Sequence, residues 1–302
     1  LCVVMGVVPS SQAIASEWLA AGRRVVAATL IERIGSAPLD PGAEMLVSDD
    51  GRIEGTVTGG CVEGALAQEA QAILGGEPAR VSTYGISDEE AAGVGLMCGG
   101  TVRVFVHEIS ADAAPVLDAV RGELEAGRPV ALATLLDGER AGAKLAVTES
   151  GVVGSLGVTE LLDRSVARDA RGFLDEGVSR VRRYGGGGEV MGDELGVYIQ
   201  AFATRPKMII FGAIDFSVAV ARLAREVGYE VTICDARKAF ASSPRFSSVA
   251  EVVIDWPDRF MEGRTLGPRD VVLVFTHDRK FDEPALTAAL ASGAGYVGAL
   301  GS

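Results

Sequence analysis

The last third of the chain alternates short apolar strands with helical segments, and this pattern constrains the fold more than any other feature. Strands are predicted at Met208–Phe211, Glu230–Cys234, Val249–Ile254, Val271–Phe275 and Gly295–Gly298, with helices at Val218–Val227 and Glu283–Ala291. Short apolar strands separated by helices favour a parallel sheet that is covered on both faces. We therefore expect a Rossmann-like parallel-sheet domain over residues 206–302.

Residues 1–205 predict a different, mixed α/β domain. Runs of β-forming residues alternate with turns, as at 23–31, 44–48, 52–57, 80–84 and 101–108, and helical spacing recurs at 62–73, 114–126 and 159–175. Four consecutive glycines at 185–188 are typical of a mobile loop. No internal repeat is apparent. The predicted fold class is thus α/β with two domains, divided near Arg205.

Composition excludes several classes of function. The net charge of −13 argues against nucleic-acid binding, which depends on Lys and Arg neutralising phosphates. No uncharged apolar run reaches the roughly 18 residues that cross a bilayer. Two histidines and four cysteines, with no CxxC pair, fit neither a histidine-based zinc site nor a disulfide scaffold. We expect a cytoplasmic protein that binds neither nucleic acid nor membrane.

Two cysteines adjoin glycine pairs, in Gly59-Gly60-Cys61 and in Cys98-Gly99-Gly100. Because the first motif lies between a strand and a helix, its free backbone N–H groups predict an anion site. The same position favours a thiolate at Cys61. The alternative is that both cysteines are buried and structural, which is the interpretation we favour for Cys234 in its strand. We likewise interpret His107 as a structural histidine with its hydrogen bonds satisfied.

The second domain opens like a dinucleotide-binding unit, with Gly212 after the first strand and Asp235 after the second. The glycine pattern is broken, however, because Ile214 stands where the backbone would approach a pyrophosphate. This argues against NAD or NADP. Arg237 could pair with Asp235 or meet a phosphate. His277 and Asp278 follow a strand at the edge where such sheets place ligands, although a solvated polar loop explains them equally well.

Several motifs occur together and in order along the chain: Gly35-Ser36-Ala37-Pro38, Gly55-Thr56-Val57-Thr58-Gly59-Gly60-Cys61-Val62-Glu63, Cys98-Gly99-Gly100 and Tyr296-Val297-Gly298-Ala299-Leu300-Gly301-Ser302. This combination resembles the XdhC/CoxI family, a bacterial type of accessory protein for molybdenum hydroxylases such as xanthine dehydrogenase. Members commonly carry a glycine at the position of Ile214 and continue beyond Ser302, so we expect the second domain to be truncated.

The resemblance implies a chaperone that binds molybdenum cofactor and assists its sulfuration and insertion into an apo-enzyme. Cys61 and Cys98 would contact the molybdenum or its sulfur, which agrees with thiolates being soft ligands. Gly59, Gly60, Gly99 and Gly100 would bind through their backbone, and Glu63 would orient the first loop. In the second domain Gly212, Asp235, Arg237, His277 and Asp278 are the candidate cofactor contacts. The partners implied are the hydroxylase, with a cysteine desulfurase and a second copy of the chain as further candidates.

Two other functions stay open. The chain could be an NAD(P)-linked oxidoreductase, or a subunit of a xanthine dehydrogenase-like enzyme, that uses Gly212, Asp235 and His277. It could also be an interaction protein whose acidic surface docks a basic partner. An accessory chaperone agrees better than a catalyst with the broken glycine pattern and the family motifs.

Overall fold

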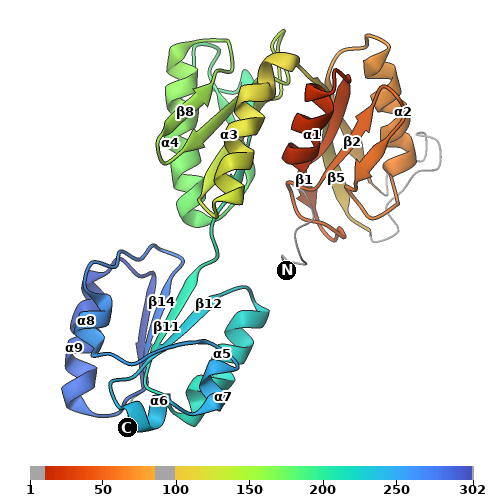
Figure 1. Ribbon diagram of the computed structural model, residues 1–302. Coiled ribbons are helices and arrows are strands. Elements are labelled where there is room, and N and C mark those ends of the chain that lie inside the picture. The colour runs from red at the N-terminus through yellow and green to blue at the C-terminus, as the bar shows by residue number, and fades with distance from the viewer. Residues whose placement is uncertain (1–10, 86–98, 301–302) are drawn as a thin grey trace. The chain divides into compact units, whose positions relative to one another are not determined.

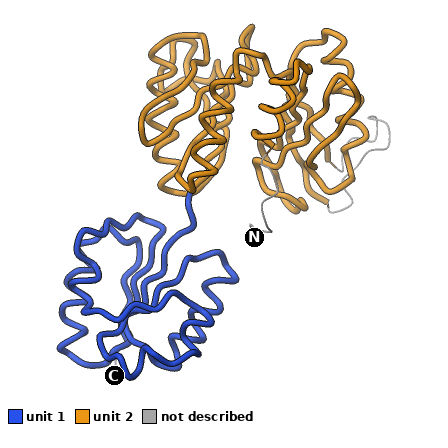
Figure 2. The backbone as a smooth tube through the Cα atoms, viewed as in Figure 1, with its two compact units in different colours: residues 1–7, 204–302 blue, residues 8–203 orange. Residues whose placement is uncertain are grey.

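The computed structural model describes residues 11–85 and 99–300. Within them the chain divides after Ala203 into an N-terminal unit and a C-terminal unit (Figure 1, Figure 2). The mixed α/β architecture and the parallel sheet expected at the C-terminal end are both present.

The N-terminal unit contains two five-stranded antiparallel sheets. The first comprises β1 (Val25–Ile34), β2 (Glu44–Ser48), β3 (Ile53–Gly55), β4 (Arg80–Tyr84) and β5 (Thr101–Ile109). The second comprises β6 (Val130–Leu135), β7 (Lys144–Thr148), β8 (Gly151–Gly154), β9 (Arg180–Tyr184) and β10 (Leu195–Phe202). The strand orders are β3-β2-β1-β5-β4 and β8-β7-β6-β10-β9, so the second sheet repeats the topology of the first.

Each sheet packs its own helix on one face and shares two helices on the other. The helices of this unit are α1 (Ser11–Ala20), α2 (Glu63–Leu74), the 3-10 turn η1 (Ala111–Ala113), α3 (Ala114–Glu125) and α4 (Glu160–Glu176). Leu66 and Ala70 of α2 are buried on the first sheet, and Val166 and Ala170 of α4 are buried on the second. A third cluster joins α1, α3 and both sheets through residues such as Trp18.

The N-terminal unit is therefore an internal repeat, which the sequence analysis missed. We call residues 25–109 repeat 1 and residues 130–202 repeat 2. Leu30 donates to the Ala43 carbonyl and accepts from Gly42, and Leu135 makes the same pair of bonds with Ala143 and Gly142. The sequences Arg80-Val81-Ser82-Thr83-Tyr84-Gly85 and Arg180-Val181-Arg182-Arg183-Tyr184-Gly185 are the visible trace of the repeat.

A tyrosine–carboxylate contact also recurs. The Tyr184 hydroxyl donates to Asp169 of α4 at 3.0 Å, and the Tyr84 hydroxyl donates to Glu69 of α2. Burial and the neighbouring carboxylate raise the pKa of both tyrosines. The same strand-to-helix contact thus ties β4 to α2 and β9 to α4.

Polar side chains meet where the two repeats contact each other. Thr29 donates to Glu44 at 2.6 Å in repeat 1, while Lys144 donates to Thr134 at 3.1 Å at the matching positions of repeat 2. Lys144 is 6% exposed, and burial lowers its pKa to about 8 even though the Glu44 carboxylate acts in the opposite direction. The repeats thus carry opposite charges at equivalent sites.

His107 lies in the same contact region, on β5. It is 1% exposed and stacks on Phe105, with 4.6 Å between the ring centroids, but neither ring nitrogen has a hydrogen-bond partner within the described residues. Burial and the Lys144 charge lower its pKa well below 6.5. The prediction of a satisfied histidine was therefore wrong, since its surroundings supply no polar partner.

The glycine run 185–188 is anchored against the start of α4. The Thr159 hydroxyl donates to the Gly187 carbonyl at 2.6 Å, and the Ser165 hydroxyl donates to the Gly188 carbonyl at 2.9 Å. A Cβ at Gly188, where φ is +101°, would clash with Leu162. These glycines permit close packing, so two hydrogen bonds hold the run that was predicted as a mobile loop against α4.

The C-terminal unit is a five-stranded parallel sheet with strand order β13-β12-β11-β14-β15 and helices on both faces (Figure 1). Its strands are β11 (Lys207–Phe211), β12 (Glu230–Cys234), β13 (Glu251–Val253), β14 (Val271–Val274) and β15 (Tyr296–Ala299). Its helices are α5 (Asp215–Glu226), α6 (Lys238–Ala241), α7 (Pro244–Ser247), α8 (Pro257–Met261) and α9 (Arg279–Ala291). This is the Rossmann strand order, whose ligand crevice lies where the order reverses, between β11 and β14.

Candidate functional site

Cys61 lies in the loop between β3 and α2, two residues before the helix begins. Its side chain is half-buried and packs against the core beneath α2. The preceding Gly59 and Gly60 have φ values of +76° and +119°, which L side chains rarely adopt. The glycines therefore let the loop reverse direction and leave the thiol at its surface.

The Glu63 carboxylate organises this loop. It accepts hydrogen bonds from the hydroxyls of Thr56 and Thr58 and from the backbone N–H groups of Val57, Thr58, Gly60 and Val62. The Gly59 N–H donates to the Thr56 hydroxyl at 2.8 Å. The expectation that the Gly59 and Gly60 amides are free for an anion was therefore wrong, because this chain's own hydroxyl and carboxylate occupy them.

The hydrogen bonds fix Glu63 in its ionised form. Burial alone would raise its pKa, but bonds from Thr56, Thr58 and Val57 outweigh that effect and lower the pKa from 4.5 to about 2. A carboxylate that accepts several backbone and hydroxyl donors is held charged at neutral pH. The loop geometry around Cys61 is thus held by an internal anion.

Two further motifs converge near this loop. Gly100 packs so closely on the 34–36 turn that a Cβ there would clash with the Ser36 carbonyl. Ala37 and Leu39, which follow that turn, pack against the same core cluster as Cys61. Gly99 is exposed, with φ of +82°. The 34–36 turn thus contacts Gly100, and the segment after it shares a core cluster with Cys61, while Cys98 lies outside the described residues.

Repeat 2 has a simpler loop at the corresponding place. Asp163 of α4 accepts from the Ser155 hydroxyl at 2.6 Å and from the Leu156 N–H at 3.0 Å, matching the bonds of Thr56 and Val57 to Glu63. Thr159 caps α4 by accepting from the Leu162 N–H at 3.1 Å. No cysteine occurs between residues 155 and 163. Only repeat 1 presents a thiol at its helix start.

In the C-terminal unit, Gly212 serves packing between strands. Its φ is +114°, and a Cβ would lie 2.9 Å from backbone atoms of Phe275 and Thr276. Ser217, fully buried on α5, donates to the Gly212 carbonyl at 2.5 Å. The glycine therefore allows β11 and β14 to approach each other, and Ile214 follows it as the residue before α5.

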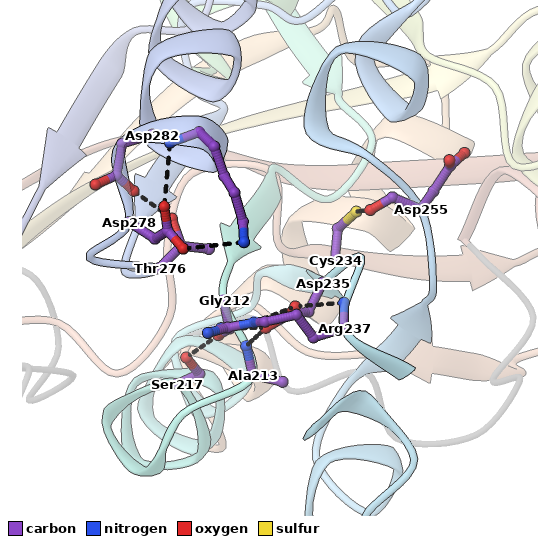
Figure 3. A network of polar contacts seen from close by, with 11 residues as sticks. Gly212, Ala213, Ser217, Cys234, Asp235, Arg237, Asp255, Thr276, Asp278 and Asp282 are labelled. Carbon is purple, nitrogen blue, oxygen red and sulfur yellow. Dashed lines mark hydrogen bonds and ion pairs between the residues drawn. The ribbon is translucent and has the colours of Figure 1, made fainter. Parts of the chain in front are cut away.

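Asp235 is the centre of a closed network (Figure 3). Its carboxylate accepts from the Ala213 N–H at 2.8 Å, from the Arg237 N–H at 2.8 Å and from Nε and Nη2 of Arg237 at 3.0 and 2.8 Å. Asp235 is 2% exposed; burial alone would raise its pKa, but the bonds from Arg237 and Ala213 lower it. A ribose hydroxyl would have to displace Arg237 to reach this acid.

His277 and Asp278 follow β14 at the same edge. His277 is exposed and has φ of +52°, the one positive value at a non-glycine residue among those described. Asp278 caps α9 by accepting from the Lys280 N–H at 3.2 Å, and it pairs with the Lys280 ammonium at 3.3 Å. Asp278 therefore has a structural role in α9, whereas His277 carries a strained backbone.

The remaining described thiol, Cys234, is buried in β12 as expected. Its Sγ donates to the Asp255 carbonyl at 3.4 Å, and burial raises its pKa to about 12. Across residues 11–85 and 99–300, no three His, Cys, Asp or Glu side chains are grouped so as to hold a metal ion. None of the helices in those ranges is long and apolar enough to cross a membrane.

Comparisons with known proteins agree with the motifs. A model of the XdhC and CoxI family matches residues 18–85 and 123–185, and a model of the XdhC Rossmann domain matches residues 208–302. The first two ranges contain β1–β4 of repeat 1 and β6–β9 of repeat 2. One family model thus covers corresponding parts of both repeats, which supports the repeat seen in the structure.

Two relatives and one solved structure are similar over different extents. The chain is 26% identical over 281 residues to a probable xanthine dehydrogenase subunit of Bacillus subtilis, covering 92% of this chain and 79% of the relative. It is 40% identical over 118 residues to the molybdenum cofactor insertion chaperone PaoD of Escherichia coli, covering 39% of this chain and 36% of PaoD. A crystal structure described as a xanthine dehydrogenase from Bacillus halodurans has a TM-score of 0.57 at 25% identity, covering 97% and 82% of the two chains.

Proposed function

The chain belongs to the XdhC and CoxI family, and from this we propose that it binds molybdenum cofactor as cargo and assists its insertion into a xanthine dehydrogenase-type molybdenum hydroxylase. The observation that carries the proposal is the family match to both units, together with the similarity to an insertion chaperone. The apo-hydroxylase is then the partner. The same proposal includes assistance in the sulfuration of the cofactor, with a cysteine desulfurase as the source of the sulfur.

Within the described residues, Cys61 is the group best suited to meet the metal. A thiolate is a soft ligand, and this thiol is half-buried on a loop whose shape Glu63 fixes. A metal that arrives already ligated by its pterin needs one protein contact rather than a complete cage, which agrees with the lack of a ligand cluster in the described chain. Glu63 then acts as a positioning residue for the thiol.

A phosphate of the cargo does not fit the Gly59-Gly60 amides while the Thr56 hydroxyl and the Glu63 carboxylate occupy them. A second anion there would face the carboxylate directly, and like charges at such distances repel strongly. Gly99 is exposed, and its neighbour Gly100 packs on the 34–36 turn, so we place such a contact there. The cargo is therefore held through the thiol and that surface rather than through an open anion nest.

The similarity to a protein named as a dehydrogenase subunit favours one alternative, a permanent subunit of such an enzyme. An insertion chaperone leaves its client, whereas a subunit stays at fixed stoichiometry. Size-exclusion chromatography of the mature hydroxylase separates the two, because a subunit co-elutes with the active enzyme. The closed Asp235–Arg237 network argues against the other alternative, an NAD(P)-linked oxidoreductase.

The direct test is to purify the full chain from cells that make molybdenum cofactor and to assay bound pterin and molybdenum. Cys61→Ser should lose molybdenum and keep its circular-dichroism spectrum, while Cys234→Ala, which removes the thiol of the other unit, should retain the metal. Full retention in Cys61→Ser would remove Cys61 from the site. Absence of both pterin and molybdenum from the unaltered protein would contradict the function itself.

Alkylation gives an independent measure of the same thiol. Cys61 should react first and Cys234 last, because a thiol with a pKa near 12 has almost no thiolate at pH 7. Bound cargo should slow the reaction at Cys61. Mass-spectrometric mapping of the modified residues gives the order in which the cysteines are alkylated. Modification of Cys234 before Cys61 would contradict the prediction.

A further inference from the structure

A cleft of about 380 Å³ lies beside the contact between the two repeats. One of its walls comes from the end of β5, from η1 and from the first turn of α3, and the other comes from the turn between β6 and β7 and from the end of β8. Clefts of this size bind small molecules, and they occur preferentially where packed modules meet. The described loop around Cys61 does not line it, so the cleft is separate from the proposed cargo contact.

The cleft is lined by charged groups of both signs and by few large apolar groups. The charged side chains are three carboxylates and two cations: Glu108, Asp112, Glu139, Arg140 and Lys144. Its apolar lining consists of three alanines and Val116. An aromatic or aliphatic ligand would bury little apolar surface there and gain little from the hydrophobic effect.

Lys144 is a buried cation without an ion pair. It is 6% exposed, and among the described residues it makes one hydrogen bond, to the Thr134 hydroxyl at 3.1 Å. Its pKa of about 8 leaves it mostly protonated at pH 7. A buried ammonium that lacks an ion pair lowers stability, and proteins keep such groups where function needs them. The lysine therefore indicates a ligand with an anionic group.

Arg140 stands at the mouth of the same cleft. Its guanidinium packs over Gly157, where a Cβ would lie 2.8 Å from Nε, so the glycine makes room for it. Its carboxylate partner is Asp112 on the opposite wall, at 3.8 Å, and both side chains are more than half exposed. Exposed ion pairs of this kind are weak, whereas a guanidinium binds a ligand carboxylate through two hydrogen bonds.

Both cations are particular to repeat 2. The Ala143 N–H donates to the Arg140 carbonyl at 2.9 Å, and the Ala43 N–H donates to the Asp40 carbonyl at 3.2 Å, so Asp40 corresponds to Arg140. Glu44 likewise corresponds to Lys144. The same turn therefore forms with carboxylates at these two positions, and the fold itself does not require the cations.

The carboxylates of the cleft exclude a simple anion and provide for a second group on the ligand. Arg24 binds Glu108 through two hydrogen bonds of 2.7 Å, which neutralises that carboxylate. Asp112 and Glu139 remain, and both residues are exposed. A ligand with two negative charges would be repelled by these acids, while a ligand that is only cationic would be repelled by Arg140 and Lys144.

We propose that this cleft binds a free α-amino acid, with its carboxylate on Arg140 and Lys144 and its ammonium on Asp112 and Glu139. A zwitterion is the small molecule that satisfies both sets of charges at once. The site does not depend on the proposed function, because neither the thiol of Cys61 nor its loop takes part in it.

The test screens the full chain against each of the common amino acids at millimolar concentration by thermal unfolding, since a ligand of the folded state raises the melting temperature. Calorimetry then measures the dissociation constant of the strongest ligand, of its analogue without the ammonium and of its analogue without the carboxylate. Each analogue should bind at least about tenfold more weakly, because each lacks one charged contact.

Variants locate the site. Arg140→Ala and Lys144→Met should each weaken amino-acid binding about tenfold, and Lys144→Met should at the same time raise the melting temperature of the free protein. Loss of binding in a more stable protein separates a lost contact from a damaged fold. Asp40→Ala changes the corresponding position of repeat 1, which does not line the cleft, and should leave the affinity unchanged.

Three results would overturn the site: no amino acid binds the folded chain at millimolar concentration, the affinity is unchanged in both Arg140→Ala and Lys144→Met, or the analogue without the ammonium binds as well as the amino acid. Amino-acid binding by a chain that purifies without pterin and molybdenum contradicts the proposed function and leaves this site standing.

Discussion

Repeat 1 and repeat 2 of the N-terminal unit share one frame and carry different loops at the start of the packed helix. In repeat 1, six hydrogen bonds from described residues converge on Glu63 and a thiol stands two residues before it. In repeat 2, Asp163 receives two such bonds and no cysteine is nearby. The strand order and the tyrosine–carboxylate contact are the same in both.

The difference separates the contacts that both repeats share from the contacts that occur in one repeat only. Contacts that occur in both repeats, such as Tyr84 with Glu69 and Tyr184 with Asp169, hold strand to helix wherever the module occurs. The glycine pair, the thiol and the additional bonds to Glu63 occur once. The proposed contact with the cargo therefore falls in the loop that is particular to repeat 1, and the following predictions test that division.

The largest effect is expected from removing the acid of each loop. Glu63→Ala leaves several backbone and hydroxyl donors without an acceptor and should cost about 3 kcal/mol of unfolding free energy, whereas Asp163→Ala should cost about 1 kcal/mol. Urea denaturation of both variants measures the difference. Equal losses would mean that Glu63 has no special role in its loop.

Glu63 should also contribute to acid sensitivity. Because its pKa in the folded state is about 2, below the ordinary 4.5, its contribution to stability is present above pH 4.5 and is lost as the pH falls from 4.5 to about 2. Glu63→Gln should therefore reduce the fall in stability over that interval, and Asp163→Asn serves as the matched control. A fall as steep as in the unaltered protein would contradict the assignment.

The next effect concerns the opposite charges between the repeats. Burial lowers the pKa of Lys144 to about 8, so folding favours its neutral form and stability is lost as the pH falls from 10.5 to about 8. Lys144→Met should therefore stabilise the protein by about 2 kcal/mol at pH 7. Glu44→Gln, at the matching position, should destabilise it, because Lys144 loses the favourable charge. Thermal unfolding should give a melting temperature above that of the unaltered protein for Lys144→Met and below it for Glu44→Gln.

A smaller, pH-dependent effect is expected at His107. Its counterpart in repeat 2 is Gln200, which donates to the Gly42 carbonyl at 3.1 Å. Since the pKa of His107 lies well below 6.5 in the fold, stability is full above pH 6.5 and falls below it. His107→Gln should therefore make the fall in unfolding free energy between pH 6.5 and pH 5.5 smaller by about 1.4 kcal/mol. An unchanged pH profile would place the acid sensitivity elsewhere.

The smallest effect tests the shared frame itself. Tyr84→Phe and Tyr184→Phe each remove one hydrogen bond to a carboxylate and should cost about 1 kcal/mol each, with a difference below about 0.5 kcal/mol. Urea midpoints of the two variants provide the comparison. A difference several times larger would show that this contact has diverged between the repeats.

The sequence predicted the elements well because their signals are local. The β–α alternation after Pro206, the family motifs and the burial of Cys234 are all confirmed. The repeat was missed because the separation in sequence between equivalent residues is not constant. Leu30 corresponds to Leu135, whereas Tyr84 corresponds to Tyr184. The shared Arg-Val-x-x-Tyr-Gly sequences would have revealed it, since each of them ends a strand at the same point of the module.

The loop around Cys61 was predicted as one segment, but its hydrogen bonds were not. Gly59, Gly60, Cys61 and Glu63 do lie together, but the sequence cannot tell that the Thr56 hydroxyl and the Glu63 carboxylate take the amides that a ligand was expected to use. The same holds for Asp235, because the sequence cannot tell that Arg237 takes its carboxylate oxygens.

The sequence by itself determined most of the longer strands and helices and the family motifs they carry, because periodicity and turn chemistry depend on neighbours a few residues apart. Only the tertiary structure decided which donors are already satisfied, which charges face each other and which aromatic rings contact Arg237. Those outcomes depend on residues that are distant in the chain and on how much water the fold excludes between them. Glu44 beside Lys144, and Arg237 between Phe240 and Phe281, are set by that packing alone.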